Sequence, residues 1–394
     1  MPVDTCQSCG SRDLEPFYRL RGIPVHSCLM VGTREQALAF PRGDLELVFC
    51  RDCGFIENRL FDPALEGYSP DYEETQAFSP RFRRFLEEIV DDHAARFGLA
   101  NRTVLEIGCG KGEFLCLLCE RTGARGIGID PGVRPERIRS PALDRLTFIR
   151  DFYGPAYAHI EADYIACRHT LEHIQPVHDF VSQIRTTIGE RKDVIVFFEL
   201  PDMKRVLCER AFWDIYYEHC SYFTDASLAS LFRRCGFAID RLYRAYDDQY
   251  LMLEARPAAT PSARPSAIDR EAVRRIGEWV ADFATGVRQT LAELDSRIRG
   301  WYAAGRRVAL WGSGSKAVSL LTTLGLGPEI QAVVDINPYK WGKFLAGSGH
   351  EIVSPERLRD LRPDVVVVAN AIYREEVAAD LARLGLAPEL FSLP

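Results

Sequence analysis

The sequence predicts an α/β protein of three units, and two repeated patterns carry the prediction. A short apolar run, a glycine loop and a helical stretch occur in TVLEIGCGKGEFL (residues 103–115) and again in RRVALWGSGSKAVSLL (306–321). About 20 residues after each loop, as in nucleotide-binding α/β folds, a second apolar run ends in aspartate, at Asp130 and Asp335. The other pattern is a duplicated CxxCG in the N-terminal segment. Strand, glycine loop and helix in alternation are typical of parallel, Rossmann-like sheets, so we predict two such units after a small cysteine-rich one.

Composition along the chain sets the predicted boundaries. Residues 255–266, ARPAATPSARPS, have the proline-, alanine- and serine-rich composition of a linker. Apolar residues three or four apart then run from Val273 to Trp301, which predicts one long amphipathic helix or a pair broken near Gly286. The predicted units are therefore an N-terminal unit over 1–75, a central unit over 76–256, linker and helix over 257–304, and a C-terminal unit over 305–394.

Charge and hydropathy exclude several classes of partner. The 394 residues carry 49 basic and 56 acidic side chains, a net charge of -7, so the chain has no overall basic field for nucleic acid or anionic lipid. No apolar run approaches the ~18–20 residues of a membrane span, and the N-terminus MPVDTCQSCG lacks the pattern of a secretory signal. We expect a cytoplasmic protein with a small-molecule partner and neither nucleic acid nor membrane; monomer and homodimer stay open.

Four of the twelve cysteines form two CxxC pairs, each followed by glycine. They are Cys6 with Cys9 in CQSCG and Cys50 with Cys53 in CRDCG. Because each pair can aim two thiolates at one ion, the two together predict a tetrahedral structural zinc site. A redox CxxC would open a helix after a strand, and neither pair has that context. The alternative, that the four cysteines bind nothing, would require the repeated CxxCG to have arisen by chance.

The first glycine loop predicts a nucleotide-binding site. Gly108, Gly110 and Gly112 let the backbone approach a ligand, the following helix turns its free N–H groups towards it, and Asp130 is spaced to accept the hydroxyls of a ribose. By itself a GxGxG loop is a weak signal that is also compatible with a dinucleotide site.

Further motifs in order make the resemblance specific. LEIGCGKGEFL with GIGIDPG resembles the first two motifs of class I S-adenosylmethionine-dependent methyltransferases, in which an acidic residue, here Glu106, ends or nearly ends the first strand. TFIRDFYG (147–154) is similar to the third motif, which implies Asp151 at the adenine amine and Phe152 beside the ring. The resemblance implies S-adenosylmethionine as cofactor and a class I methyltransferase fold for the central unit.

The histidines of the central segment differ in context. ADYIACRHTLEHIQPVHDFV reads as the fourth strand and the loop beyond it, so Arg168, His169, Glu172 and His173 fall where open α/β sheets bind ligands. We expect a site role there, with Arg168 and His169 towards the cofactor. His93, in the helical run FRRFLEEIVDDHAARF, is expected on a solvated helix face.

The run FWDIYYEHCSYFT (212–224) combines the groups of an acid–base site. Glu218 and His219 supply a carboxylate and a base, and Tyr216 and Tyr222 supply phenol donors. From the residues alone, a packed aromatic cluster with a satisfied histidine explains the run equally well.

YEHCSYFT resembles the signature of the sugar C-methyltransferase family, whose members join a cysteine zinc module, a methyltransferase domain and a Rossmann-like C-terminal domain. In that family the histidine of Tyr-x-Glu-His is the proposed base. The resemblance therefore implies His219 as base, with Glu218 orienting it and Tyr216 beside it. An N-terminal tyrosine also contributes in the family, and Tyr68 and Tyr72 are both candidates.

The second glycine loop departs from a dinucleotide fingerprint. Gly312 and Gly314 are followed by Lys316, but Ala317 stands where a third glycine is expected, which weakens NAD binding. GSGSKAVSLL and VVDINPYKWGKFLAGSG resemble instead the C-terminal domain of the C-methyltransferases. The resemblance implies a nucleotide-sugar site that includes Asn337 and Lys340.

The implied reaction is methylation of a carbon beside a ketone in a nucleotide-linked deoxy-keto-sugar. Such a carbon needs a base at its proton and donors at the oxygen, for which Tyr216, Tyr222 and His173 are candidates. Three alternatives stay open: an O- or N-methyltransferase, a zinc-containing binding module, and a methyltransferase fused to an NAD-dependent sugar oxidoreductase or epimerase.

Overall fold

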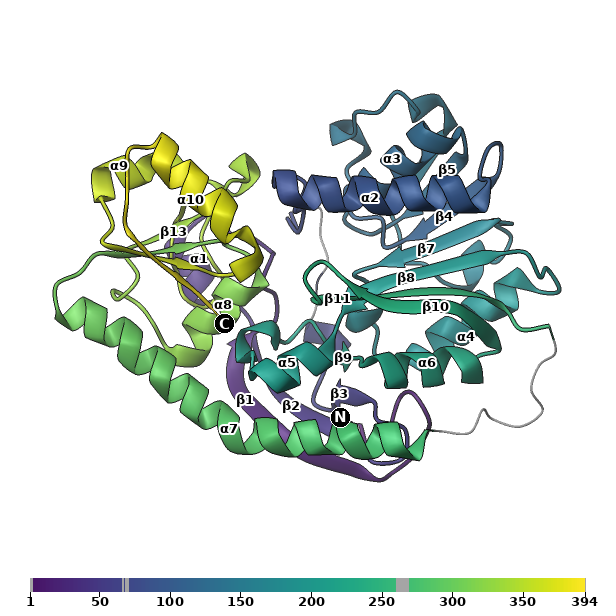
Figure 1. Ribbon diagram of the computed structural model, residues 1–394, viewed down its shortest axis with the longest axis horizontal. Coiled ribbons are helices and arrows are strands. Elements are labelled where there is room, and N and C mark those ends of the chain that lie inside the picture. The colour runs from purple at the N-terminus through teal and green to yellow at the C-terminus, as the bar shows by residue number, and fades with distance from the viewer. Residues whose placement is uncertain (1–2, 66, 68–70, 260–268, 394) are drawn as a thin grey trace.

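A computed structural model describes residues 3–65, 67, 71–259 and 269–393, and they form three sheets with covering helices (Figure 1). The first sheet has strands in the order β1-β2-β3-β9, the second β10-β11-β8-β7-β4-β5-β6 and the third β14-β13-β12-β15-β16. The predicted α/β class with two Rossmann-like sheets is confirmed. Among the described residues, no helix is both long and apolar enough to cross a membrane.

The N-terminal sheet is antiparallel. It contains β1 (Leu14–Pro24), β2 (Arg42–Cys50) and β3 (Ile56–Asn58), with α1 (Arg34–Leu38) between the first two strands. Its fourth strand, β9 (Ser221–Tyr222), comes from the central segment and pairs with β3, so that Ile56 lies opposite Tyr222. The aromatic run 212–224 therefore contributes a strand to the N-terminal sheet. The predicted boundary at residue 75 does not include this strand in the N-terminal unit.

The central sheet has five parallel strands extended by a hairpin. Strands β6, β5, β4, β7 and β8 are parallel, whereas β11 is antiparallel to β8 and pairs with β10. The strands are β4 (Thr103–Ile107), β5 (Arg125–Ile129), β6 (Leu146–Ile149), β7 (Tyr164–Arg168), β8 (Ile195–Pro201), β10 (Phe237–Ala245) and β11 (Tyr250–Pro257). The helices are α2 (Pro80–Phe97), α3 (Glu113–Thr122), α4 (Val177–Ile188), α5 (Met203–Glu209) and α6 (Asp225–Arg234). The strand order reverses between β4 and β7, so a ligand crevice is expected at their carboxyl ends.

The C-terminal sheet is wholly parallel, and its strand order also reverses within the sheet. Its strands are β12 (Val308–Trp311), β13 (Ala332–Val334), β14 (Ile352–Val353), β15 (Val365–Val368) and β16 (Glu389–Ser392). Its helices are α8 (Ser315–Leu324), α9 (Leu358–Leu361) and α10 (Arg374–Arg383). The order reverses between β12 and β15, which places a second crevice at the carboxyl ends of those strands.

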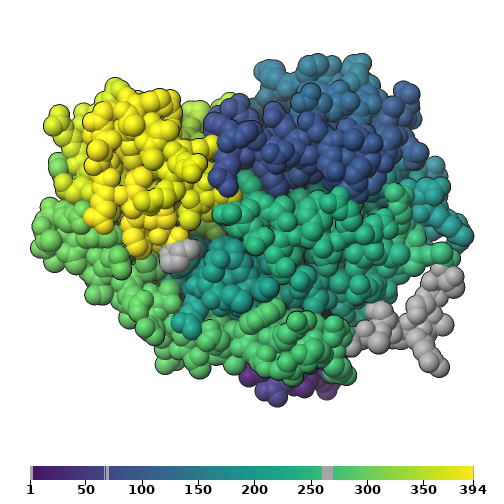
Figure 2. Space-filling model, in the orientation of Figure 1, coloured from purple at the N-terminus to yellow at the C-terminus, as the bar shows by residue number. Residues whose placement is uncertain are grey.

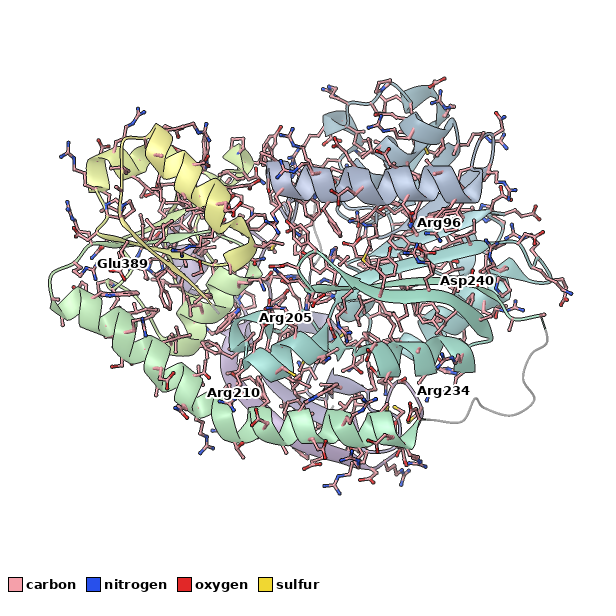
Figure 3. The ribbon with its side chains drawn as sticks, in the orientation of Figure 1. Arg96, Arg205, Arg210, Arg234, Asp240 and Glu389 are labelled. Atoms are coloured by element: carbon pink, nitrogen blue, oxygen red, sulfur yellow. The ribbon has the colours of Figure 1, made fainter. Side chains whose placement is uncertain are left out.

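A single long helix joins the C-terminal sheet to the N-terminal one. Helix α7 (Arg270–Ala303) runs unbroken through Gly286 and lies along β1 and α5 (Figure 1). Phe283 is fully buried and meets the rings of Phe17 and Tyr18 edge-on. Arg210, labelled in Figure 3, follows α5 and pairs with Asp282 of the helix. The apolar stripe of α7 is therefore core between the units.

The central and C-terminal units also touch across the top of the molecule. Figure 2 shows the C-terminal residues against the end of α2. There the Glu376 carboxylate accepts hydrogen bonds from the Ser79 hydroxyl (2.8 Å) and the Arg81 amide (2.6 Å), capping the first turn of α2. Nearby, the Tyr246 hydroxyl donates a hydrogen bond to the Tyr373 hydroxyl at 2.7 Å. These contacts join the two glycine-loop units next to the space between their crevices.

Candidate active site

One cavity of about 950 Å³ receives the carboxyl ends of both parallel sheets. Its wall includes the loop after β4, the loop after β7 and the loop after β12, together with residues of the aromatic run 212–224. A cavity this large is at the upper end of the ~300–1,000 Å³ usual for ligand sites. Two ligands can therefore share it, one on each glycine loop.

The first glycine loop is shaped by its own aspartate. Gly108, Gly110 and Gly112 have φ of 70°, 52° and 82°, a region that strains other residues. The Asp130 carboxylate accepts the Gly110 amide at 3.0 Å and the Gly132 amide at 2.6 Å. Asp130 thus holds the loop open while it lines the cavity.

Gly108→Ala should weaken binding of S-adenosylmethionine at least tenfold, as measured by calorimetry. A Cβ at this position would overlap the side chain of Thr170, and the positive φ adds strain of about 1–2 kcal/mol. Gly123→Ala is the matched control, because Gly123 has φ of 73° with no atom within 4 Å of an added Cβ. Equal affinities in the two variants would show that the close approach to Thr170 does not matter.

Buried polar groups beside this loop suit a cationic, nucleoside-bearing cofactor. Glu106, the penultimate residue of β4, is almost fully buried, and its Oε2 has no hydrogen-bond partner among the described residues. Burial raises the pKa of Glu106 to about 8. A cation bound beside it would favour the ionised carboxylate and lower that pKa again. Phe152 lines the cavity with 61% of its surface exposed, and Asp151 lies next to it. The Tyr157 hydroxyl donates to the Asp151 carboxylate at 2.6 Å.

Arg168 and His169 share the carboxylate of Glu199 on β8. Arg168 Nε donates to Glu199 Oε2 at 2.5 Å, and His169 Nε2 lies 2.9 Å from Oε1. Burial would lower the pKa of His169, but Glu199 and Glu172 raise it to about 9. Both residues line the cavity as charged groups that are already balanced, so their predicted role towards the cofactor stays a prediction.

His219 lies in the cavity wall as an uncharged imidazole. It is 6% exposed, and its Nε2 lies 3.1 Å from the Tyr216 hydroxyl. The His173 ring stands edge-on to it with centroids 4.8 Å apart. Burial, together with the neighbouring His173 and His169, lowers the pKa of His219 well below its ordinary value. His219 is therefore able to accept a proton at neutral pH.

Two residues predicted from the aromatic run do not reach the cavity. Tyr222 is in β9, and its hydroxyl donates to the Tyr216 carbonyl at 3.3 Å. Glu218 contacts His26 and Ser27, whereas His219 contacts Tyr216. The prediction that Glu218 orients His219 by direct contact is therefore wrong. Neither Tyr222 nor Glu218 is among the described residues that line the cavity.

The Glu218 carboxylate instead binds the N-terminal unit. Its Oε2 lies 2.9 Å from His26 Nδ1 and accepts the Tyr72 hydroxyl at 3.3 Å, while its Oε1 accepts the amide and hydroxyl of Ser27. His26 Nε2 accepts the amide of Gly67 at 3.2 Å, which leaves the hydrogen on Nδ1 to donate to Glu218. Tyr72, a predicted substrate-binding residue, lines the cavity, whereas the other candidate, Tyr68, lies outside the described residues.

His26 and Ser27 were missed because PVHSC has no motif-like spacing. The Ser27 oxygen also lies 2.7 Å from the Ser315 hydroxyl, which can donate to it, so all three units meet beside Glu218. The one available signal was a histidine beside a serine in an otherwise apolar stretch, and that pattern is common in cores.

His26→Ala should lower kcat about tenfold, since a hydrogen bond to a charged group contributes ~1.5–3 kcal/mol and its loss lets Glu218 and Tyr72 move. His26→Asn keeps a donor near the Nδ1 position and should retain most of the rate. The exposed His159→Asn is the control. A kcat unchanged in His26→Ala, with folding verified by its melting temperature, would show that the contact is structural only.

The second glycine loop is organised as the first one is. The Asp335 carboxylate accepts the Ser313 amide at 3.0 Å, the Ser313 hydroxyl at 2.5 Å and the Asn337 amide at 2.9 Å. Lys340 Nζ lies 3.4 Å from the same carboxylate. Gly312 and Gly314 line the cavity beside them.

The predicted substrate-binding side chains here already have protein partners. Lys316 pairs with Asp214, which Arg205, labelled in Figure 3, also binds. Asn337 donates to Glu73 at 3.1 Å. All of them except Glu73 line the cavity, so their predicted role towards a substrate remains a prediction.

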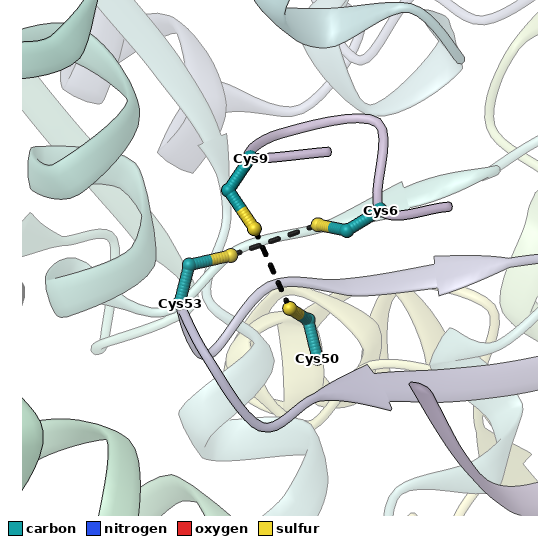
Figure 4. Close-up of side chains that lie close together, drawn as sticks. All are labelled: Cys6, Cys9, Cys50 and Cys53. Carbon is teal, nitrogen blue, oxygen red and sulfur yellow. Dashed lines mark hydrogen bonds between the residues drawn. The ribbon is translucent and has the colours of Figure 1, made fainter. Parts of the chain in front are cut away.

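The four predicted cysteines converge on one point (Figure 4). The Sγ atoms of Cys6 and Cys53 are 3.6 Å apart, as are those of Cys9 and Cys50, and all four can ligate one ion. A tetrahedral ion with sulfur at ~2.3 Å requires sulfurs about 3.8 Å apart. The set fits a metal with no position left for substrate.

Comparisons with known proteins agree with this geometry. A family model described as a methyltransferase domain matches residues 76–242, and one described as a C-methyltransferase C-terminal domain matches 263–387. C-methyltransferase NovU of Streptomyces niveus is 27% identical over 95% of this chain and 91% of its own. The chain belongs to the family of S-adenosylmethionine-dependent C-methyltransferases that its motifs resemble.

Two solved structures similar to this C-methyltransferase each match less than half of it. An O-methyltransferase family protein from Burkholderia thailandensis is 17% identical, over 45% of this chain and 57% of its own, with a TM-score of 0.38. A magnesium protoporphyrin IX methyltransferase from Synechocystis PCC 6803 with bound SAH is 15% identical, over 45% and 84%, with a TM-score of 0.35.

Proposed function

We propose that this C-methyltransferase methylates the carbon beside the ketone of a nucleotide-linked keto sugar, with His219 as the base. The observation that carries the proposal is the place of His219, buried in the wall of a cavity that two nucleotide-type glycine loops share. Burial also lowers its pKa, which favours the uncharged form that a base needs. One loop suits the cofactor and the other the nucleotide of the substrate.

The cofactor site uses the first loop. Bound S-adenosylmethionine would supply an electrophilic methyl group on a sulfonium centre. Glu106, the loop glycines and Asp130 would hold its polar parts, and Asp151 with Phe152 would contact its adenine. Ser79, the N-cap of α2, and Glu376 both line the cavity, and their hydrogen bond joins the central and C-terminal units beside this space.

His219 would remove the proton next to the ketone, and the resulting enolate carbon would take the methyl group. If Nε2 donates to the Tyr216 oxygen, Nδ1 is the nitrogen that receives the proton. His173, whose ring centroid is 4.8 Å from that of His219, would donate to the ketone oxygen as negative charge develops there. As the carbon–carbon bond forms, the bond between the methyl group and sulfur would break, so the products would be the C-methylated ketone and S-adenosylhomocysteine. His219 would stay protonated until solvent takes the proton.

The substrate's nucleotide would lie along the second loop. Gly312 and Gly314 leave its backbone open, and Lys316 and Lys340 are cations within reach of a diphosphate. Their carboxylate partners, Asp214 and Asp335, keep both charges in place before substrate arrives. Substrate would therefore meet an ordered, charge-balanced site.

The four cysteines would hold a structural zinc ion, because the distances between their sulfurs fit its tetrahedral shell. The ion would join the segment around Cys6 to the β2–β3 turn.

Two measurements test the proposed reaction. Nucleotide-linked 4-keto sugars incubated with methyl-labelled S-adenosylmethionine should yield a product labelled on carbon. In deuterated water without cofactor, the enzyme should exchange the proton next to the ketone, and His219→Asn should not. Label on oxygen or nitrogen, with no exchange, would instead assign the alternative O- or N-methylation.

A further inference from the structure

Three side chains in the cavity wall form a potential metal-binding cluster distinct from the four cysteines. Glu172, His173 and His219 can each direct one ligand atom so that all three lie within 4.8 Å of one another. The two loops that carry them are joined, because the Cys220 amide donates to the Glu172 carbonyl at 2.9 Å. The three ligand positions therefore keep their spacing.

The carboxylate of Glu172 lacks a full set of partners. The residue is 2% exposed, and its Oε1 lies 3.4 Å from His169 Nδ1. Its Oε2 is buried and accepts no hydrogen bond from any described residue. A buried carboxylate oxygen without a donor is costly, and a cation bound there removes the cost.

Charges around this cluster do not preclude a cation. His169 is balanced by Glu199, and Lys316 is balanced by Asp214. A second cluster of similar composition, Asp92, His93 and Glu254, differs here: Arg96 and Arg241 already bind the Glu254 carboxylate.

We propose that Glu172, His173 and His219 bind one divalent transition-metal ion of the Zn²⁺ or Co²⁺ type, which then inhibits the enzyme. Two imidazoles and a carboxylate are ligands that these ions favour, and three protein ligands leave a position for water. A metal on His219 takes the lone pair that the base needs. The inhibition rests on the proposed role of His219, whereas the binding does not.

Cobalt titration tests the binding. The probe is Co²⁺, added to protein whose cysteine site is already filled with zinc, one zinc per chain being verified by elemental analysis. One further equivalent should bind, with visible absorption but without the near-ultraviolet charge-transfer band of thiolate ligands. Glu172→Gln and His173→Asn should each weaken binding at least tenfold, and the exposed His159→Asn should not. Zinc content and melting temperature show that each variant is folded.

Activity measured in the same titration tests the inhibition. Turnover should fall in proportion to the second site's occupancy and return when a chelator removes the cobalt. Absence of a second equivalent, or binding unchanged in both Glu172→Gln and His173→Asn, would overturn the site and leave the base to be judged by His219→Asn alone. Binding with full turnover would overturn the inhibition and count against His219 as base.

Discussion

Replacing His219 with asparagine should lower turnover by about 10²–10⁴-fold, the range expected when a general base is removed. Asparagine retains the size and a hydrogen-bonding group near Tyr216, so the cavity wall should survive. Binding of S-adenosylmethionine should stay within threefold of wild type, because the cofactor loop is supported by Asp130 and Thr170, not by His219. Single-turnover methyl transfer and calorimetry measure the two quantities.

The pH profile of the wild type gives an independent reading of the same residue. Below its pKa His219 is protonated and cannot accept the substrate's proton, so kcat/KM should fall as pH decreases through that value. Because burial lowers the pKa of His219, the acid limb should lie below the ordinary histidine range near 6.5. The exposed His159→Asn serves as the control for general effects of losing an imidazole. Near-full turnover in His219→Asn would remove the base assignment.

The fold could be predicted largely from local pattern. Glycine loops that follow buried strands occur in the chain at the start of both parallel sheets, and the order of motifs was enough to place the crevices. The four cysteines likewise converge as their spacing indicated. In each glycine loop and each CxxC pair, the residues that act together are only a few positions apart, so the local backbone fixes their relative positions.

Contacts between distant segments were harder to predict. Glu218 follows the family motif, but its partners His26 and Ser27 lie 192 and 191 residues away, and nothing local indicates them. Lys316 has the position of a phosphate ligand yet pairs with Asp214 across units. Such pairings depend on how the units pack, which is a tertiary property.

One error could have been avoided from the sequence. His93 was expected on a solvated face, but it is fully buried and its Nδ1 lies 2.8 Å from the Tyr164 hydroxyl. It follows Leu86, Ile89 and Val90 at helical spacing on the buried side of α2. Assigning the helix face before judging the residue type would have placed it in the core.

Loss of the four-cysteine metal should be as damaging as loss of the base. Structural zinc in small modules contributes about 10–16 kcal/mol to folding. Cys50 ends β2, and three-residue β3 follows the turn that Cys53 holds. Because β3 pairs with β9, which begins two residues beyond His219, a metal on the four cysteines would support the strand next to the proposed base.

Cys50→Ser should therefore lose its zinc, fall in melting temperature and lose at least 10²-fold in turnover, the lower bound expected for a displaced base. Cys208→Ser is the matched control, since Cys208 is an exposed cysteine outside the cluster. Zinc content, thermal unfolding and methyl transfer are measured on the same preparations. A zinc-free Cys50→Ser protein with normal turnover would mean that β9 keeps its place without the metal, and that its contact with the Leu171–His173 turn is enough to position His219.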